Sequence, residues 1–201
     1  MGTIRKERLE LFSDGVFAII LTLLVLDLKV PESVGLAGLR AALPGLIVHA
    51  GAFFVIGMAW ITHHQFLEHV ERIGSNMLGY NLLTLFWITL VPYGARIAAE
   101  QPHDGLGAAI MVASTTMSIA SAILMALFGD FQSVVHEPIM QSFRKRRAAL
   151  FLTYITLGAV TIVLCFVSPW FGYAFLSLGA LALFTPPPTV VHARLLATDV
   201  S

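Results

Sequence analysis

A single acidic residue interrupts an apolar run near the start of the chain. Asp14 follows Phe12 and Ser13, and the residues after it are apolar as far as Leu26, apart from Thr22. A carboxylate is tolerated in apolar surroundings only when it is paired and hydrogen-bonded. The sequence therefore predicts that Asp14 meets a hydrogen-bond donor inside the protein.

A second polar group follows Trp60 and contains His63, His64, Glu68 and His69. His64 and Glu68 are four residues apart and share one face of a helix. The order H-E-x-x-H is absent, so we expect no metal site and no cofactor. The sequence leaves open which polar group at this end of the molecule donates to Asp14: Arg8, Trp60, His63, His64, His69, Tyr80, Asn81 or Trp87.

The composition shows what kind of elements must position these residues. Of 201 residues, 57% are hydrophobic and 12% are charged, whereas a soluble domain has about 25% charged residues. Mean hydropathy is +0.83. The 12 basic and 12 acidic residues cancel, which argues against a polybasic nucleic-acid binder. Cys165 is the only cysteine, so no intrachain disulfide forms. The sequence predicts a protein embedded in a lipid bilayer.

Six apolar blocks divide the chain, and each is close to the ~20 residues that a membrane-spanning helix needs. They cover residues 11–30, 43–66, 77–99, 106–128, 148–167 and 171–191. No linker between them is long enough for a soluble domain. We therefore expect an all-α polytopic membrane protein, with one domain of six transmembrane helices over residues 1–201.

The basic residues predict how this domain lies in the membrane. With six spans both termini lie on one side, and that side carries nine of the 12 Lys and Arg residues, including the run Phe143–Arg147. The other side carries Lys29, Arg40 and Arg96. The positive-inside rule places both termini in the cytoplasm of a multi-pass protein in the cell membrane.

The first block carries an apolar stripe at helical spacing. At about 100° per residue, Ile19, Thr22, Leu23 and Leu26 share one narrow face, and Asp14 lies about 140° from Ile19. Such a stripe suits either a packing seam or a pore. If it faces a pore, Asp14 points into the protein. Thr22 also has a local option, because its hydroxyl can bond to a carbonyl of its own helix.

The segment Arg8-x-x-x-Phe12-Ser13-Asp14, at the start of the first of six helices, resembles the R-x-x-x-F-S-D signature of the transmembrane protein 175 family. The resemblance is to its short prokaryotic members, which carry one six-helix unit. It implies a potassium-permeable homotetramer whose first helices line the pore, with potassium ions, lipid and identical subunits as partners. It also implies a constriction at Ile19, further apolar rings at Leu23 and Leu26, and a potassium preference set at Thr22.

The resemblance implies a structural role for the polar residues around Asp14. They would form one network outside the conduction path: Arg8, Phe12, Ser13, Asp14, Trp60, His63 and His64. The chain has no T-V-G-Y-G segment, because Phe171-Gly172-Tyr173 lacks the preceding Thr-Val. A carbonyl cage is therefore not expected, whereas a narrow apolar ring gates by losing its water.

Two other functions compete with a channel. A proton-coupled secondary transporter would use Asp14 and the histidines of the second helix. The absence of an evident inverted repeat argues against it. An intramembrane enzyme ranks lower, because the sequence shows no recognisable nucleophile or metal motif.

Overall fold

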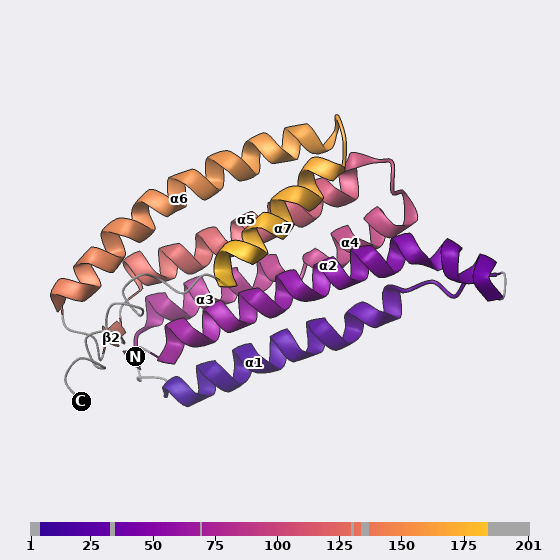
Figure 1. Ribbon diagram of the computed structural model, residues 1–201. Coiled ribbons are helices and arrows are strands. Elements are labelled where there is room, and N and C mark those ends of the chain that lie inside the picture. Colours follow the sequence, from indigo (N-terminus) through magenta and orange to yellow (C-terminus); the bar gives the residue numbers. More distant parts are fainter. Residues whose placement is uncertain (1–4, 33–34, 69, 130, 134–136, 185–201) are drawn as a thin grey trace, which may run out of the picture.

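The computed structural model describes residues 5–32, 35–68, 70–129, 131–133 and 137–184, and nearly all of them are helical (Figure 1). The side chains of residue 71 and of residues 131–150 and 180–184 fall outside the described part. The basic side chains of the run Phe143–Arg147 are therefore among those outside the described part. Residues 185–191, the end of the sixth expected block, also lie outside it.

The described helices run side by side along a common direction, and two short strands pair at one end of the bundle (Figure 1). The strands are β1 (Val70–Ile73) and β2 (Phe131–Ser133), antiparallel. The helices are α1 (Lys6–Leu23), continued by the 3-10 helix η1 (Leu24–Asp27), α2 (Gly35–Glu68), α3 (Ser75–Ile88), α4 (Val91–Glu100), α5 (Gly105–Phe128), α6 (Glu137–Cys165) and α7 (Trp170–Phe184).

Four of the described helical stretches are long and apolar enough to cross a membrane. They are Lys6–Asp27, Gly35–Glu68, Ser75–Glu100 and Gly105–Phe128. The fifth and sixth expected blocks fall on α6 and α7, whose described apolar stretches are shorter. A bilayer offers backbone groups no water to bond with, so helices are the form in which such segments satisfy them. The chain is a multi-pass helical membrane protein.

The block expected as one helix over 77–99 is divided into α3 and α4. Pro92 stands in the first turn of α4. Proline has no N–H and its ring clashes with the carbonyl four residues earlier, here that of Ile88. Before the break, Thr89 N–H still donates to Leu85 O at 3.1 Å, and Leu90 N–H donates to Trp87 O at 3.2 Å. The proline therefore explains the break within one membrane span.

Small residues allow α5 to pack closely against its neighbours. Its start is capped by Asp104, whose Oδ1 accepts the Leu106 N–H at 2.9 Å. A Cβ at Gly107 would fall on the backbone of Ala98 in α4. Small residues permit such backbone approaches between membrane helices. α5 is thus enclosed by α3, α4 and α6.

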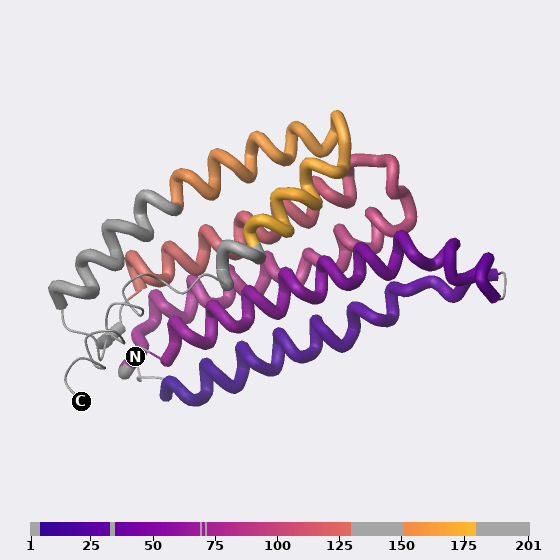
Figure 2. Tube along the Cα trace, in the orientation of Figure 1, coloured from indigo at the N-terminus to yellow at the C-terminus, as the bar shows by residue number. Residues whose placement is uncertain are grey.

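α1 and α6 lie on opposite edges of the bundle (Figure 2). α1 rests on α2 and α3 and buries Leu9, Ser13, Phe17 and Ile20 towards them. Leu24 in η1 continues this buried side. As an edge helix, α1 leaves its other side without contacts to other residues that the structure describes.

Gly107→Ala tests the close packing of α4 on α5. The added methyl group would overlap the backbone of Ala98. We therefore expect the unfolding free energy to fall by about 1–3 kcal/mol, as is typical of overpacking. Gly79→Ala is the matched control, because nothing lies within 4 Å of its Cβ position and alanine favours a helix by about 1 kcal/mol. Thermal unfolding in detergent measures both. Equal melting temperatures for the two variants would contradict the packing described here.

Candidate functional site

α1 presents two faces of very different exposure. Phe17 and Leu24 are 1% and 2% exposed, whereas Ile19, Leu23 and Leu26 are 59%, 54% and 75% exposed. The three exposed side chains belong to the stripe expected from the helical spacing. In a membrane protein such a face meets lipid, another subunit or a pore. We call it the free face of α1, and the name includes Leu26 of η1, which continues α1.

Thr22 lies on the free face, and its hydroxyl is bonded within its own helix. Thr22 Oγ1 donates towards the carbonyls of Ala18 and Ile19, at 3.0 Å each. These bonds use the hydroxyl hydrogen but leave lone pairs on the oxygen. Thr22 therefore adds one acceptor oxygen to an otherwise apolar surface.

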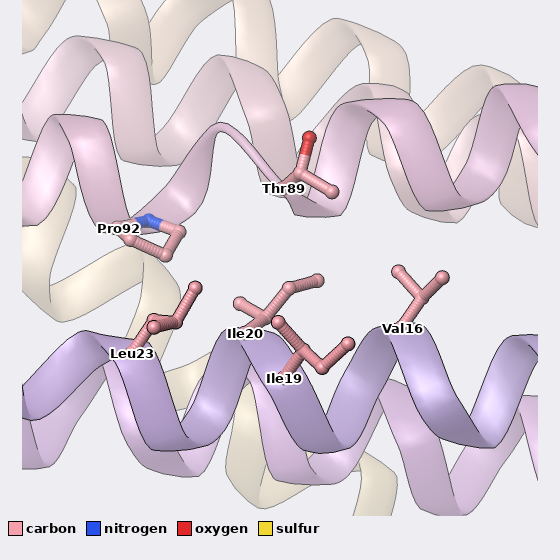
Figure 3. Close-up of a pocket in the computed structure, with 6 residues that line it drawn as sticks. All are labelled: Val16, Ile19, Ile20, Leu23, Thr89 and Pro92. Atoms are coloured by element: carbon pink, nitrogen blue, oxygen red, sulfur yellow. The ribbon is translucent and has the colours of Figure 1, made fainter.

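An apolar crevice of about 330 Å³ separates α1 from the break between α3 and α4. Val16, Ile19, Ile20 and Leu23 rise from α1 towards Thr89 and Pro92 (Figure 3). The Thr89 hydroxyl points away from the crevice because it donates to Phe86 O at 2.6 Å. Ile19 and Leu23 thus border both the free face and a space into which their side chains can turn.

A buried polar joint ties the first three helices together at the end where β1 lies. Asn81 of α3 is fully buried and donates from Nδ2 to Ser13 Oγ of α1 at 3.1 Å. His63 Nε2 of α2 lies 2.7 Å from Asn81 Oδ1. An amide oxygen only accepts, so His63 Nε2 carries a hydrogen and donates it. We call these three residues the inner joint.

Asp14 has its own partner beside the inner joint. The indole Nε1 of Trp60 donates to Asp14 Oδ1 at 2.8 Å. The Trp60 ring stacks on His64 at 5.7 Å between centroids, and His64 Nε2 lies 3.5 Å from Glu68 Oε1. Of the candidate donors that the structure describes, Trp60 is the one that meets Asp14. His69, another candidate, lies outside the described residues. The chain of contacts leads from the half-buried carboxylate to the exposed end of α2.

The structure places the expected network residues in two groups and leaves two of them apart. Ser13 and His63 meet through Asn81, and Asp14, Trp60 and His64 follow one another. Phe12 is 52% exposed. Arg8 is exposed, and its side chain forms no hydrogen bond or ion pair with other residues that the structure describes. Arg8 and Phe12 therefore lie on the surface of the described part of the chain.

From the sequence alone, Asn81 was not predicted to be the centre of the inner joint. It was named only as one of several candidate donors for Asp14. The available signal was an amide in the middle of an apolar block, because buried polar side chains are almost always bonded. Among the described residues, no group of three or more His, Cys, Asp or Glu side chains is placed to hold a metal ion.

The fold and this site define a polytopic membrane protein with a polar joint inside and an apolar face outside. Residues 8–92 match the family model described as endosomal/lysosomal potassium channel TMEM175. A potassium channel of Chryseobacterium sp. (strain P1-3) is 32% identical over 186 residues, which cover 90% of this chain and 93% of the relative. The chain belongs to the TMEM175 family, whose members are ion channels and not enzymes.

Two further relatives differ in how much of them the chain covers. The crystal structure of a lysosomal potassium-selective channel TMEM175 homolog from Chamaesiphon minutus aligns with a TM-score of 0.69 and 26% identity, over 89% of this chain and 95% of that one. The endosomal/lysosomal proton channel TMEM175 of Mus musculus is 30% identical over 164 residues, which are 73% of this chain and 33% of the mouse protein.

Asn81→Ala tests the inner joint. It leaves the His63 N–H and the Ser13 hydroxyl buried without their partner, and we expect a loss of about 1–3 kcal/mol in unfolding free energy. Thr62→Ala is the control, since the one bond of the Thr62 hydroxyl to other described residues is to Met58 O of its own helix, at 2.9 Å. Melting curves in detergent compare the two. An Asn81→Ala protein as stable as Thr62→Ala would show that the joint does not hold these helices.

Proposed function

We propose that the chain forms a potassium-permeable homotetramer whose pore is lined by the free face of α1. The observation that carries this proposal is the contrast between the two faces of that helix. One is buried to 1–2% exposure at Phe17 and Leu24, and the other is more than half exposed at Ile19, Leu23 and Leu26. In a symmetric ring of four subunits, a continuous apolar face on an edge helix can turn towards the common axis.

The constriction of the proposed pore is apolar. Ile19 forms the narrowest ring, and Leu23 and Leu26 form further rings nearer the end at η1. A narrow apolar ring blocks ions when water leaves it, and widening it restores conduction. The crevice beside α1 supports this mechanism, because it gives the side chains of Ile19 and Leu23 room to turn away from the axis.

Potassium is the proposed permeant ion for two reasons. The relatives that the chain covers to 93–95% of their own length are named potassium channels. Thr22 also offers an acceptor oxygen on the free face, one turn from Ile19. Potassium loses its water shell at a lower energetic cost than sodium does, so a mostly apolar path with few oxygens favours potassium. The sequence contains no T-V-G-Y-G segment, and the proposal needs no carbonyl cage.

The proposed orientation places both termini in the cytoplasm and the protein in the cell membrane. The inner joint then lies at the cytoplasmic end, near Arg72 in β1, and η1 lies at the outer end. The distribution of Lys and Arg supports this orientation through the positive-inside rule. Asp14 stays bonded to Trp60 beside the path, as a structural residue.

Ile19→Cys tests the constriction. Soluble thiol reagents or cadmium are expected to abolish most of the current through this variant in liposomes. Ile20→Cys is the neighbouring control, because Ile20 is 7% exposed and faces the bundle. The parent protein controls for Cys165, which is buried. Current through Ile19→Cys that no reagent reduces would rule out Ile19 as a pore residue.

Thr22→Val tests the ion preference. The parent protein should give unitary currents whose reversal potential follows the potassium gradient. Removing the hydroxyl is expected to lower the potassium-over-sodium permeability ratio by roughly fivefold, the factor for one hydrogen-bond-sized contact of about 1 kcal/mol. Thr62→Val serves as the control.

The same recordings test the competing transporter. Slow proton-coupled flux without unitary events would favour a carrier that uses Asp14 and the histidines of α2, and would contradict the channel. An unchanged permeability ratio in Thr22→Val would remove Thr22 from the selectivity mechanism.

A further inference from the structure

The outer end of the proposed pore helix is weakly fixed by its own backbone. The α-helix ends at Leu23, and the chain continues as η1 from Leu24 to Asp27 before Leu28 becomes extended. Short 3-10 segments have poorer hydrogen-bond geometry than α-helices. In η1 only Leu24 is buried. The direction of Leu26, the last expected ring residue, therefore depends on something besides helical bonding.

An ion-pair cluster lies directly after Leu26. Arg96 Nη1 of α4 is 3.7 Å from Asp27 Oδ1, and Arg96 Nε is 3.3 Å from Glu100 Oε1. Lys29 Nζ reaches the same Glu100 oxygen at 3.4 Å. We call Asp27, Lys29, Arg96 and Glu100 the outer cluster. Its charges balance, and it connects the end of the pore helix to α4 at two points.

α4 is closely packed against the rest of the bundle, so it can hold this end of the pore helix in position. Val91, Gly94, Ala95 and Ala98 are buried. A Cβ at Gly94 would stand 2.8 Å from the Met111 backbone nitrogen of α5. The side of α4 that carries Arg96 is therefore held in place by close backbone packing on its opposite side.

The members of the outer cluster are partly or largely exposed, and exposed ion pairs contribute little to folding stability. Their effect is expected in the position of η1 rather than in the melting temperature. Arg96 stands between carboxylates of two elements, Asp27 and Glu100, and its planar group binds several oxygens in a fixed geometry.

We infer that Arg96 is a positioning residue that fixes the direction of Leu26 by holding Asp27 against α4. This inference rests on the proposed function, because it concerns one end of the helix that is proposed to line the pore. In a tetramer the four outer clusters would hold the four Leu26 side chains in one ring.

Cadmium block of Leu26→Cys currents tests this inference. Four thiols that are held in one ring bind cadmium tightly. Adding Arg96→Gln is expected to weaken the apparent cadmium affinity by up to roughly fivefold, the upper limit for one exposed ion pair. Removing a positive charge would by itself strengthen cadmium binding. The expected fall in cadmium affinity therefore has the opposite sign to a simple charge effect.

A double-mutant cycle on the same background separates position from charge. If Arg96 and Asp27 act as a pair, then Arg96→Gln, Asp27→Asn and the two together all lower the affinity by a similar factor. If only local charge matters, the single variants shift the affinity in opposite directions and the double variant resembles the parent, which overturns the inference. Arg40→Gln is the matched control, since Arg40 lies on the same side of the membrane in the proposed orientation and outside the cluster.

Ile19→Cys serves as the internal reference for these recordings. Ile19 lies within the α-helical part of α1, so its cadmium block should not change with Arg96→Gln. If neither Ile19→Cys nor Leu26→Cys is blocked, the proposed pore itself is wrong. If both are blocked but Arg96→Gln leaves the Leu26→Cys affinity unchanged, the pore stands and the positioning role of Arg96 is wrong.

Discussion

The bonds among Ser13, Asn81 and His63 fix how α1 is turned against the rest of the bundle. A bilayer supplies no water to replace a lost hydrogen bond, so a buried polar group must find its partner in one arrangement of the helices. Asn81 satisfies both neighbours at once, at 3.1 Å to Ser13 and 2.7 Å to His63. With Ser13 turned inward, the helical repeat turns Phe17, Ile20 and Leu24 inward as well.

The same rotation determines what remains outside. Ile19, Thr22, Leu23 and Leu26 are left on the free face because the inward positions are already taken. Polar contacts hold α1 near both ends, through Asp14 and Trp60 at one end and through the outer cluster at the other. Between them the contact towards α3 and α4 opens into an apolar crevice. In the proposed channel, fixed ends and a loosely packed middle allow the constriction to change width.

The sequence predicted the parts of this arrangement that depend on local pattern. Hydropathy predicted membrane-spanning helices, and four of the described helical stretches are long and apolar enough to be such helices. The helical wheel predicted that Asp14 points away from Ile19 and towards a donor, and Asp14 accepts a hydrogen bond from Trp60. The choice of Trp60 could not be predicted, because its indole reaches Asp14 across 46 positions of the chain and several other donors lie at the same end. Pro92 could have predicted the break near Thr89, but the continuous apolar block was expected to form one helix.

Arg8, Phe12 and Arg96 show where sequence reasoning ends. Arg8 and Phe12 belong to the motif that suggested the family, yet they lie on the surface of the chain. Arg96 looked like one of three basic residues outside the positively charged side, and its pairing with Asp27 depends on how α4 packs on η1. Contacts between distant elements are not encoded in the spacing of one helix.

The central claim is that the free face of α1, rather than another exposed surface, surrounds the axis of the assembly. Electron-electron distance measurements between nitroxide labels at Leu26 in reconstituted protein test it most directly. A four-fold ring gives two distances in a ratio of about 1.4. Labels at Leu157 provide the comparison, because Leu157 is 53% exposed and belongs to α6, which lies at the opposite edge of the bundle from α1 (Figure 2). The account predicts clearly shorter distances for Leu26 than for Leu157. Longer distances for Leu26, or none that fit four subunits, would contradict it.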